Sequence, residues 1–184
     1  MLAYVFWHAA PENVNAAEYE KVLSDFARNL AAIDCPGFLG NASYAIGMTP
    51  WLHENGYEDW NWLFDSAAID RLNEMAVSGA MEKPHHAIAQ MTKHGGFGGL
   101  FRLVAGEHIA FGDSKVFWLS RPRGVQWRDA MPDIAGPAPS NVAVWRRQMV
   151  LGPSPEFAVI GPPDFTLAVP SGWQALEVQR RRIA

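Results

Sequence analysis

The chain has 184 residues, of which 49% are hydrophobic and 18% are charged, and its formal net charge is −4. This composition excludes a disordered chain. The negative net charge gives no bias towards nucleic acid. No run of apolar residues approaches the ~18 that a membrane span needs. The only cysteine, Cys35, has no partner for an intramolecular disulfide and is expected to be a plain buried or turn residue. We therefore expect a globular protein of the cytoplasm. Residues 112–184 are the basic part of the chain, with 9 Lys/Arg against 6 Asp/Glu, and leave room for a weak anion site.

The first 111 residues predict the order βαββαβ. Residues 15–33 carry an apolar stripe at helical spacing, with Asn15 as N-cap and Pro36-Gly37 as the end of the helix. The alternating residues 58–64 are typical of a strand. The other expected elements are strands over 2–9, 38–46 and 98–104, a helix over 66–78, a turn at Gly95-Gly96, and a helix from about Pro84 to residue 93. This order is the ferredoxin-like plan.

The remaining residues predict a shorter version of the same plan. The expected elements are strands over 115–120, 141–151, 156–161 and 173–183, a short helix over 126–134, a loop over 136–140, and a hairpin turn at Gly152-Pro153-Ser154-Pro155. Pro162, Pro163, Pro170 and Gly172 leave room for about one helical turn where the second helix would lie. The second half is therefore expected to lack most of that helix.

A short segment recurs along the chain. Val5-Phe6-Trp7-His8-Ala9-Ala10-Pro11 returns as Val116-Phe117-Trp118-Leu119-Ser120-Arg121-Pro122, at an offset of 111 residues with four of seven positions identical. The glycine-led segment 96–103 also resembles the segment 172–178. Two matches in the same order favour a duplication, with one half-domain over 1–111 and a truncated one over 112–184.

Two ferredoxin-like halves with aromatic strands resemble the dimeric α+β barrel superfamily, here as a tandem version in one chain. The resemblance covers nearly the whole chain but includes no signature residues of a characterised member. It implies that the two sheets pack against each other and enclose a central space. Members of the superfamily include cofactor-free monooxygenases, muconolactone-type isomerases, haem-degrading enzymes and chlorite-dismutase-like proteins, so the fold alone leaves the reaction open.

Strand alternation sorts the candidate site residues onto one face of the first sheet. We expect Trp60, Trp62 and Phe64 to pack under the helices, because a helix-covered face should be apolar. The opposite face would then line the central space with the aromatic residues Tyr4 and Phe6 and with the polar residues His8, Asn41, Ser43, Asp59, Asn61 and Arg102. A cavity with such a mixed lining is the usual form of a small-molecule site.

The residue types suggest roles in that site. His8 can act as a general base near neutral pH, with Asp59 orienting it and Asn61 as a further catalytic residue. Arg102 can hold a carboxylate or a phenolate, and Tyr4, Phe6, Asn41 and Ser43 would contact the ligand. The alternative is that these residues form a satisfied polar network or face solvent at sheet edges.

Other motifs give weaker indications. Glu82 and His86 lie four residues apart, as metal ligands can, but Pro84 is expected to break the helix between them, and no metal site is predicted. His85 or His86 as an axial haem ligand remains an alternative to an enzyme without a tightly bound cofactor. The glycine run 95–99 follows a helix and precedes a strand, so it indicates a strand that a neighbouring aromatic residue approaches closely rather than a nucleotide loop.

Two classes of function follow. The first is a small-molecule-binding protein, possibly a cofactor-free monooxygenase or isomerase, acting on an aromatic or acidic metabolite. The second is an assembly module in which Trp51, Trp127 and Trp145 are exposed and form a homodimer face. Neither involves nucleic acid or a membrane, and the basic runs Arg146-Arg147 and Arg180-Arg181-Arg182 are expected to be solvated surface.

Overall fold

The computed structural model describes residues 1–93, 96–107, 112–135, 141–152 and 155–184. The expected loop over 136–140, Gly95 of the expected turn, and Pro153-Ser154 of the expected hairpin lie outside these ranges. The strands are β1 (Leu2–His8), β2 (Phe38–Ile46), β3 (Gly56–Leu63), β4 (Phe97–Ala105), β5 (Ser114–Ser120), β6 (Ala143–Arg147), β7 (Phe157–Gly161) and β8 (Gln174–Arg182). The helices are α1 (Ala16–Ala31), α2 (Ala67–Ala76), α3 (Glu82–Met91) and α4 (Trp127–Ala135), with a 3-10 turn at Gly79–Met81.

The strands form a closed barrel in the order β1-β3-β2-β8-β5-β7-β6-β4. The first half contributes β4-β1-β3-β2 and the second half contributes β6-β7-β5-β8, so each half has its first and third strands in the middle. The halves join where β2 pairs with β8 and where β4 pairs with β6. The predicted α+β barrel of two ferredoxin-like halves is confirmed.

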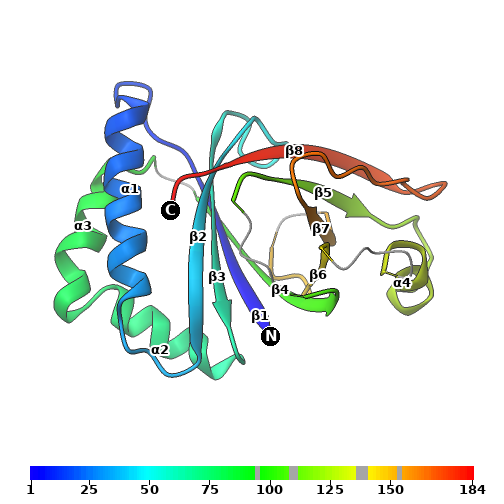
Figure 1. Cartoon of the computed structure of the whole chain (residues 1–184), viewed down its shortest axis with the longest axis horizontal. Coiled ribbons are helices and arrows are strands. Elements are labelled where there is room, and N and C mark those ends of the chain that lie inside the picture. Colours follow the sequence, from blue (N-terminus) through cyan, green and yellow to red (C-terminus); the bar gives the residue numbers. More distant parts are fainter. Residues whose placement is uncertain (94–95, 108–111, 136–140, 153–154) are drawn as a thin grey trace.

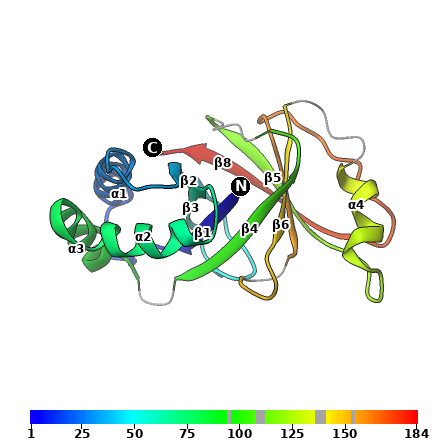
Figure 2. The same cartoon turned by 90° about the horizontal axis from the view of Figure 1, so that it is seen from below.

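The two halves differ in their helices, as Figures 1 and 2 show. Helices α1, α2 and α3 lie against one side of the first sheet, and α4 lies at the opposite end of the molecule. The described residues 162–173, between β7 and β8, contain turns but no helix. This agrees with the prolines that were expected to remove the second helix of this half.

Tryptophan side chains fill the inside of the barrel. Trp7 and Trp118, which occupy matching positions of the recurring segment, are fully buried there with ring centroids 5.5 Å apart. Trp60 and Trp62 belong to the same buried cluster, so the expectation that they pack under the helices was wrong. Phe64 was also misplaced, because it is 70% exposed at the end of the strand. The central space is therefore a packed aromatic core.

Two further expectations about exposure are corrected by this core. Trp51 and Trp145 are buried in it, so they cannot form an exposed homodimer face. Trp127, the first residue of α4, is half-buried. Arg180 was expected on the surface, but it is 3% exposed and forms an ion pair with Glu58 inside the barrel. Among the described residues, no helix is long and apolar enough to cross a membrane.

Candidate functional site

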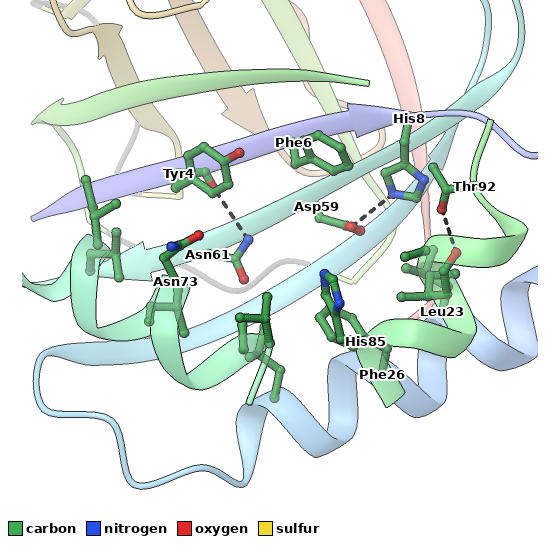
Figure 3. Close-up of a pocket in the computed structure, with 18 of the residues that line it drawn as sticks. Tyr4, Phe6, His8, Leu23, Phe26, Asp59, Asn61, Asn73, His85 and Thr92 are labelled. Atoms are coloured by element: carbon green, nitrogen blue, oxygen red, sulfur yellow. Dashed lines mark hydrogen bonds and ion pairs between the residues drawn. The ribbon is translucent and has the colours of Figure 1, made fainter. Parts of the chain in front are cut away.

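A cavity of about 600 Å³ lies between the outer face of the first sheet and helices α1, α2 and α3 (Figure 3). Five of the eight predicted site residues line it: Tyr4, Phe6, His8, Asp59 and Asn61. The helices supply the apolar part of the lining, mainly Leu23, Phe26, Leu30, Ile69, Leu72 and Ile88. We call this cavity the sheet–helix pocket. Its size and its largely apolar lining suit a small organic ligand.

Strand register explains why these five side chains meet. In the antiparallel pair β1–β3, Tyr4 lies opposite Asn61 and Phe6 lies opposite Asp59, with His8 next along β1. Residues two apart on a strand share a face, so the grouping on one face was predicted correctly. The prediction that this face lines the inside of the barrel was wrong. The face meets the helices instead.

The other three predicted residues do not line the sheet–helix pocket. The Asn41 amide donates a hydrogen bond of 3.0 Å to the carbonyl oxygen of Ala27 in α1. Ser43 is buried, and its backbone pairs with the C-terminal residues of the chain. Arg102 is exposed on β4. A role for these three in binding the pocket's ligand therefore finds no support in the geometry.

His8 is held from both sides. Its Nε2 lies 2.9 Å from Asp59 Oδ2, and its Nδ1 lies 2.6 Å from the hydroxyl of Tyr19 in α1. That hydroxyl lies 2.9 Å from Thr92 Oγ1, and the Thr92 hydroxyl donates to the carbonyl oxygen of Ile88. The ring orientation of His8 is thus fixed by a chain of hydrogen bonds that ends on the backbone of α3.

The hydrogen-bond directions from Asp59 to Ile88 depend on how many protons the His8–Asp59 pair carries. If the Thr92 hydrogen goes to Ile88, the Tyr19 hydroxyl must donate to Thr92, and His8 Nδ1 must donate to Tyr19. A further proton is then needed between His8 Nε2 and Asp59 Oδ2. All of these contacts are satisfied together only when the His8–Asp59 pair carries that additional proton. The form of the pair that lacks this proton can therefore accept one from a ligand, and the existing network then holds it.

The two members of the pair differ in access. His8 is 2% exposed and Asp59 is 17% exposed. Asp59 Oδ1 is buried and has no hydrogen-bond partner among the described residues, so the carboxylate has an unused acceptor besides its bond to His8. A ligand in the pocket meets Asp59 first, and His8 lies behind it.

Tyr4 supplies a hydroxyl donor to the same cavity. Burial, and secondarily the charge of Asp59, raise the pKa of Tyr4 above its ordinary value. The phenol therefore keeps its proton at neutral pH and can donate a hydrogen bond to a ligand oxygen. Figure 3 shows Tyr4, Asn61 and Asn73 on one side of the pocket, with His8, Asp59 and Thr92 towards the other.

Glycines in and beside β4 make room for the two aromatic residues of the pocket wall. A Cβ atom added to Gly98 would lie 2.8 Å from the Tyr4 hydroxyl oxygen, and one added to Gly96 would lie 2.4 Å from Phe6 Cζ. Gly96 and Gly98 therefore allow the close approach of aromatic rings, as the sequence context of the glycine run indicated.

Replacing Gly98 with alanine should displace the Tyr4 ring and weaken ligand binding or turnover by up to about a hundredfold, the cost of misplacing a group by about 1 Å. The matched control is Gly47→Ala, since a Cβ there would meet nothing within 4 Å. Ligand titration and thermal unfolding of both variants check this. Equal ligand affinity in the two variants would show that the Tyr4 position is unimportant.

Sequence reasoning missed the helical contributions to the site. Tyr19 lies within the apolar stripe predicted for residues 15–33, which gave it no role in the site, whereas its hydroxyl holds His8. Thr92 and Asn73 gave no signal, because their role depends on the packing of α3 and α2 against the sheet. Tyr19 offered one usable signal, since a buried tyrosine usually finds a hydrogen-bond partner.

The pocket residues do not fit haem, the alternative raised by the resemblance. His85 lines the pocket, whereas His86 is exposed on α3. Haem also carries two propionates, but the charged lining consists of Asp59, Asp70 and Lys93, and Lys93 is already paired with a carboxylate. This negative lining would repel the propionates.

Metal binding gains no support either. Contrary to the expected break, α3 begins at Glu82 and runs unbroken past His86, with Pro84 in its first turn. No group of three or more His, Cys, Asp or Glu side chains in the described part of the chain is arranged to hold a metal ion.

Comparison with known proteins supports the fold. No protein-family model and no curated protein sequence matches the chain. A "putative monooxygenase" from Fusobacterium nucleatum superposes with a TM-score of 0.67 at 6% identity, covering 100% of this chain and 92% of that one. A "putative monooxygenase" from Lactobacillus acidophilus superposes with a TM-score of 0.57 at 10% identity, covering 100% and 94%. The chain thus has the dimeric α+β barrel fold, formed by the two halves of one polypeptide.

Proposed function

We propose that the protein is a cofactor-free monooxygenase that binds an aromatic small molecule in the sheet–helix pocket. The observation that carries the proposal is the His8–Asp59 pair in the wall of a cavity with a largely apolar and aromatic lining. The names of the two structural neighbours are consistent with an oxygenase.

The chemistry begins with a proton transfer. Asp59, the more exposed member of the pair, takes a proton from an acidic C–H group of the substrate, and His8 shares the proton through Nε2. This assignment exchanges the roles first suggested for the two residues. Tyr4 donates a hydrogen bond to the substrate oxygen on which negative charge develops. Tyr19 positions His8 and does not itself meet the substrate.

The deprotonated substrate is an electron-rich carbanion, which can react directly with dioxygen. A methylene carbon of the substrate would lose both of its hydrogens and gain one oxygen atom, so that it becomes a carbonyl carbon. The second oxygen atom would leave with the two hydrogens as water. The reaction is balanced, because one methylene group and one dioxygen molecule give one carbonyl group and one water molecule. Dioxygen is the oxidant and the substrate carbon is oxidised.

The first experiment is a thermal-shift screen of the purified protein against aromatic compounds with an acidic C–H group, followed by oxygen uptake with the compounds that bind. A ligand that binds only the folded state stabilises it by about 2.7 kcal/mol at a hundredfold excess over its dissociation constant. The expected result is binding with oxygen uptake. Proton exchange at the substrate carbon without oxygen uptake would indicate an isomerase and not a monooxygenase. The absence of any binding would overturn the proposed function.

A further inference from the structure

Three arginines, Arg102, Arg128 and Arg146, lie near one another where β4 and β6 pair, away from the sheet–helix pocket. Arg102 of β4 is the cross-strand partner of Arg146 of β6, where the two halves of the chain join. The Arg146 guanidinium lies 3.9 Å from the ring centroid of Trp127, and the Arg128 guanidinium lies 5.4 Å from that centroid. None of the three arginines lines the sheet–helix pocket.

No ion pair among the described residues includes Arg102, Arg128 or Arg146. The charge of Glu156 acts on Arg146 in the favourable direction, but both Glu156 carboxylate oxygens already accept hydrogen bonds from Arg121, at 2.9 and 3.1 Å. Like charges directly opposite each other on neighbouring strands destabilise a sheet.

Arg146 shows the electrostatic consequence of this arrangement. Burial, followed by the charges of Arg102 and Arg128, lowers the pKa of Arg146 from its ordinary value. Its Nε atom is buried and has no hydrogen-bond partner among the described residues. A buried donor without an acceptor is costly and is usually satisfied by a partner. An anion at this position would satisfy the donor and offset the repulsion.

We propose that Arg102, Arg128 and Arg146 bind the phosphate group of a small ligand at the seam between β4 and β6. Three neighbouring positive charges suit a group with about two negative charges, and the planar donors of arginine match phosphate oxygens. Trp127 holds the guanidinium of Arg146 in place by a cation–π contact. The site is independent of the proposed oxygenase activity.

The test is thermal unfolding in increasing phosphate at constant ionic strength, with chloride as the balancing salt. Phosphate also stabilises proteins without binding to a site, so variants are needed to separate the two effects. Arg102→Gln and Arg146→Gln remove cluster charges, and Lys83→Gln is the charge-matched control, exposed on α3 without a cluster contact. Phenyl phosphate in place of inorganic phosphate distinguishes a phosphate ester from the free ion.

The expected result is a saturable rise of Tm in the wild type and in Lys83→Gln, with at least a tenfold weaker phosphate affinity in both arginine variants. In chloride alone, Arg102→Gln should unfold no earlier than the wild type, because it removes a like-charge pair. Tighter binding of phenyl phosphate would identify an ester as the ligand. A rise of Tm that is the same in all four proteins would be a general salt effect, and it would overturn the proposal that these arginines bind phosphate.

Discussion

Replacing Glu58 with glutamine is expected to lower the free energy of unfolding by about 3–5 kcal/mol, the cost of leaving one partner of a buried ion pair uncompensated. Glu58 is fully buried inside the barrel and lies 3.1 Å from Arg180 Nη1. Its two carboxylate oxygens also accept hydrogen bonds of 2.7 and 2.6 Å from the indole N–H groups of Trp7 and Trp60. A glutamine has one acceptor oxygen, and its NH₂ group can only donate. That NH₂ group would therefore point at an N–H donor that now bonds to a carboxylate oxygen of Glu58.

Urea unfolding measures this effect, and an exposed ion pair supplies the control. Glu20 pairs with Arg181 at 2.6 Å, but the Arg181 side chain is 57% exposed. Glu20→Gln should therefore cost only about 0–1 kcal/mol. A cost for Glu58→Gln that is no larger than this control would mean that the pair does not stabilise the barrel.

The double variant Glu58→Gln with Arg180→Met measures how much the ion pair as a whole contributes to the free energy of unfolding. Removing both charges should restore much of the lost stability, because the penalty of the single variant comes from the isolated Arg180 charge. Arg180 also stacks over Tyr44 and donates to Ser114, contacts that connect β8 of the second half with strands of both halves. The remaining loss then measures these contacts.

The sequence predicted the elements and the grouping of side chains well, because both follow from local patterns. Period-two alternation placed Asp59 and Asn61 on one strand face and Trp60 and Trp62 on the other, as in the structure. Alternation does not say which layer each face meets. The interior of a closed barrel needs large apolar side chains to fill it, and this need placed the tryptophans inside.

The long-range contacts had no local signal. Glu58 and Arg180 are 122 positions apart and come from different halves, so only the pairing of β2 with β8 brings them together. Arg146 was expected to be plain surface because its neighbour Arg147 points to the other face. Its cluster forms instead with Arg102 from the adjacent strand and Arg128 from a helix, a combination visible only in three dimensions.

Replacing Asp59 with asparagine is expected to lower kcat/KM by about 10²–10⁴-fold, the usual contribution of general base catalysis, once a substrate has been identified. Asparagine keeps the size of the side chain and a hydrogen-bond acceptor for His8, so the fold should be retained. His8→Ala should reduce turnover to a similar level, because Asp59 then loses the partner that shares the proton. The effects of the two changes should not add, since the pair acts as one unit.

Tyr19→Phe separates positioning from chemistry. Removing the Tyr19 hydroxyl frees His8 Nδ1 but leaves the contact between His8 and Asp59 in place, so kcat should fall less than in Asp59→Asn and its pH profile should shift. Asn41→Ala is the matched control, because Asn41 lies on the same sheet face but bonds the backbone of α1 outside the pocket. If Asp59→Asn keeps wild-type proton exchange at the substrate carbon, the base lies elsewhere. Unchanged kcat with an unchanged pH profile in Tyr19→Phe would show that the Tyr19 hydroxyl does not position His8.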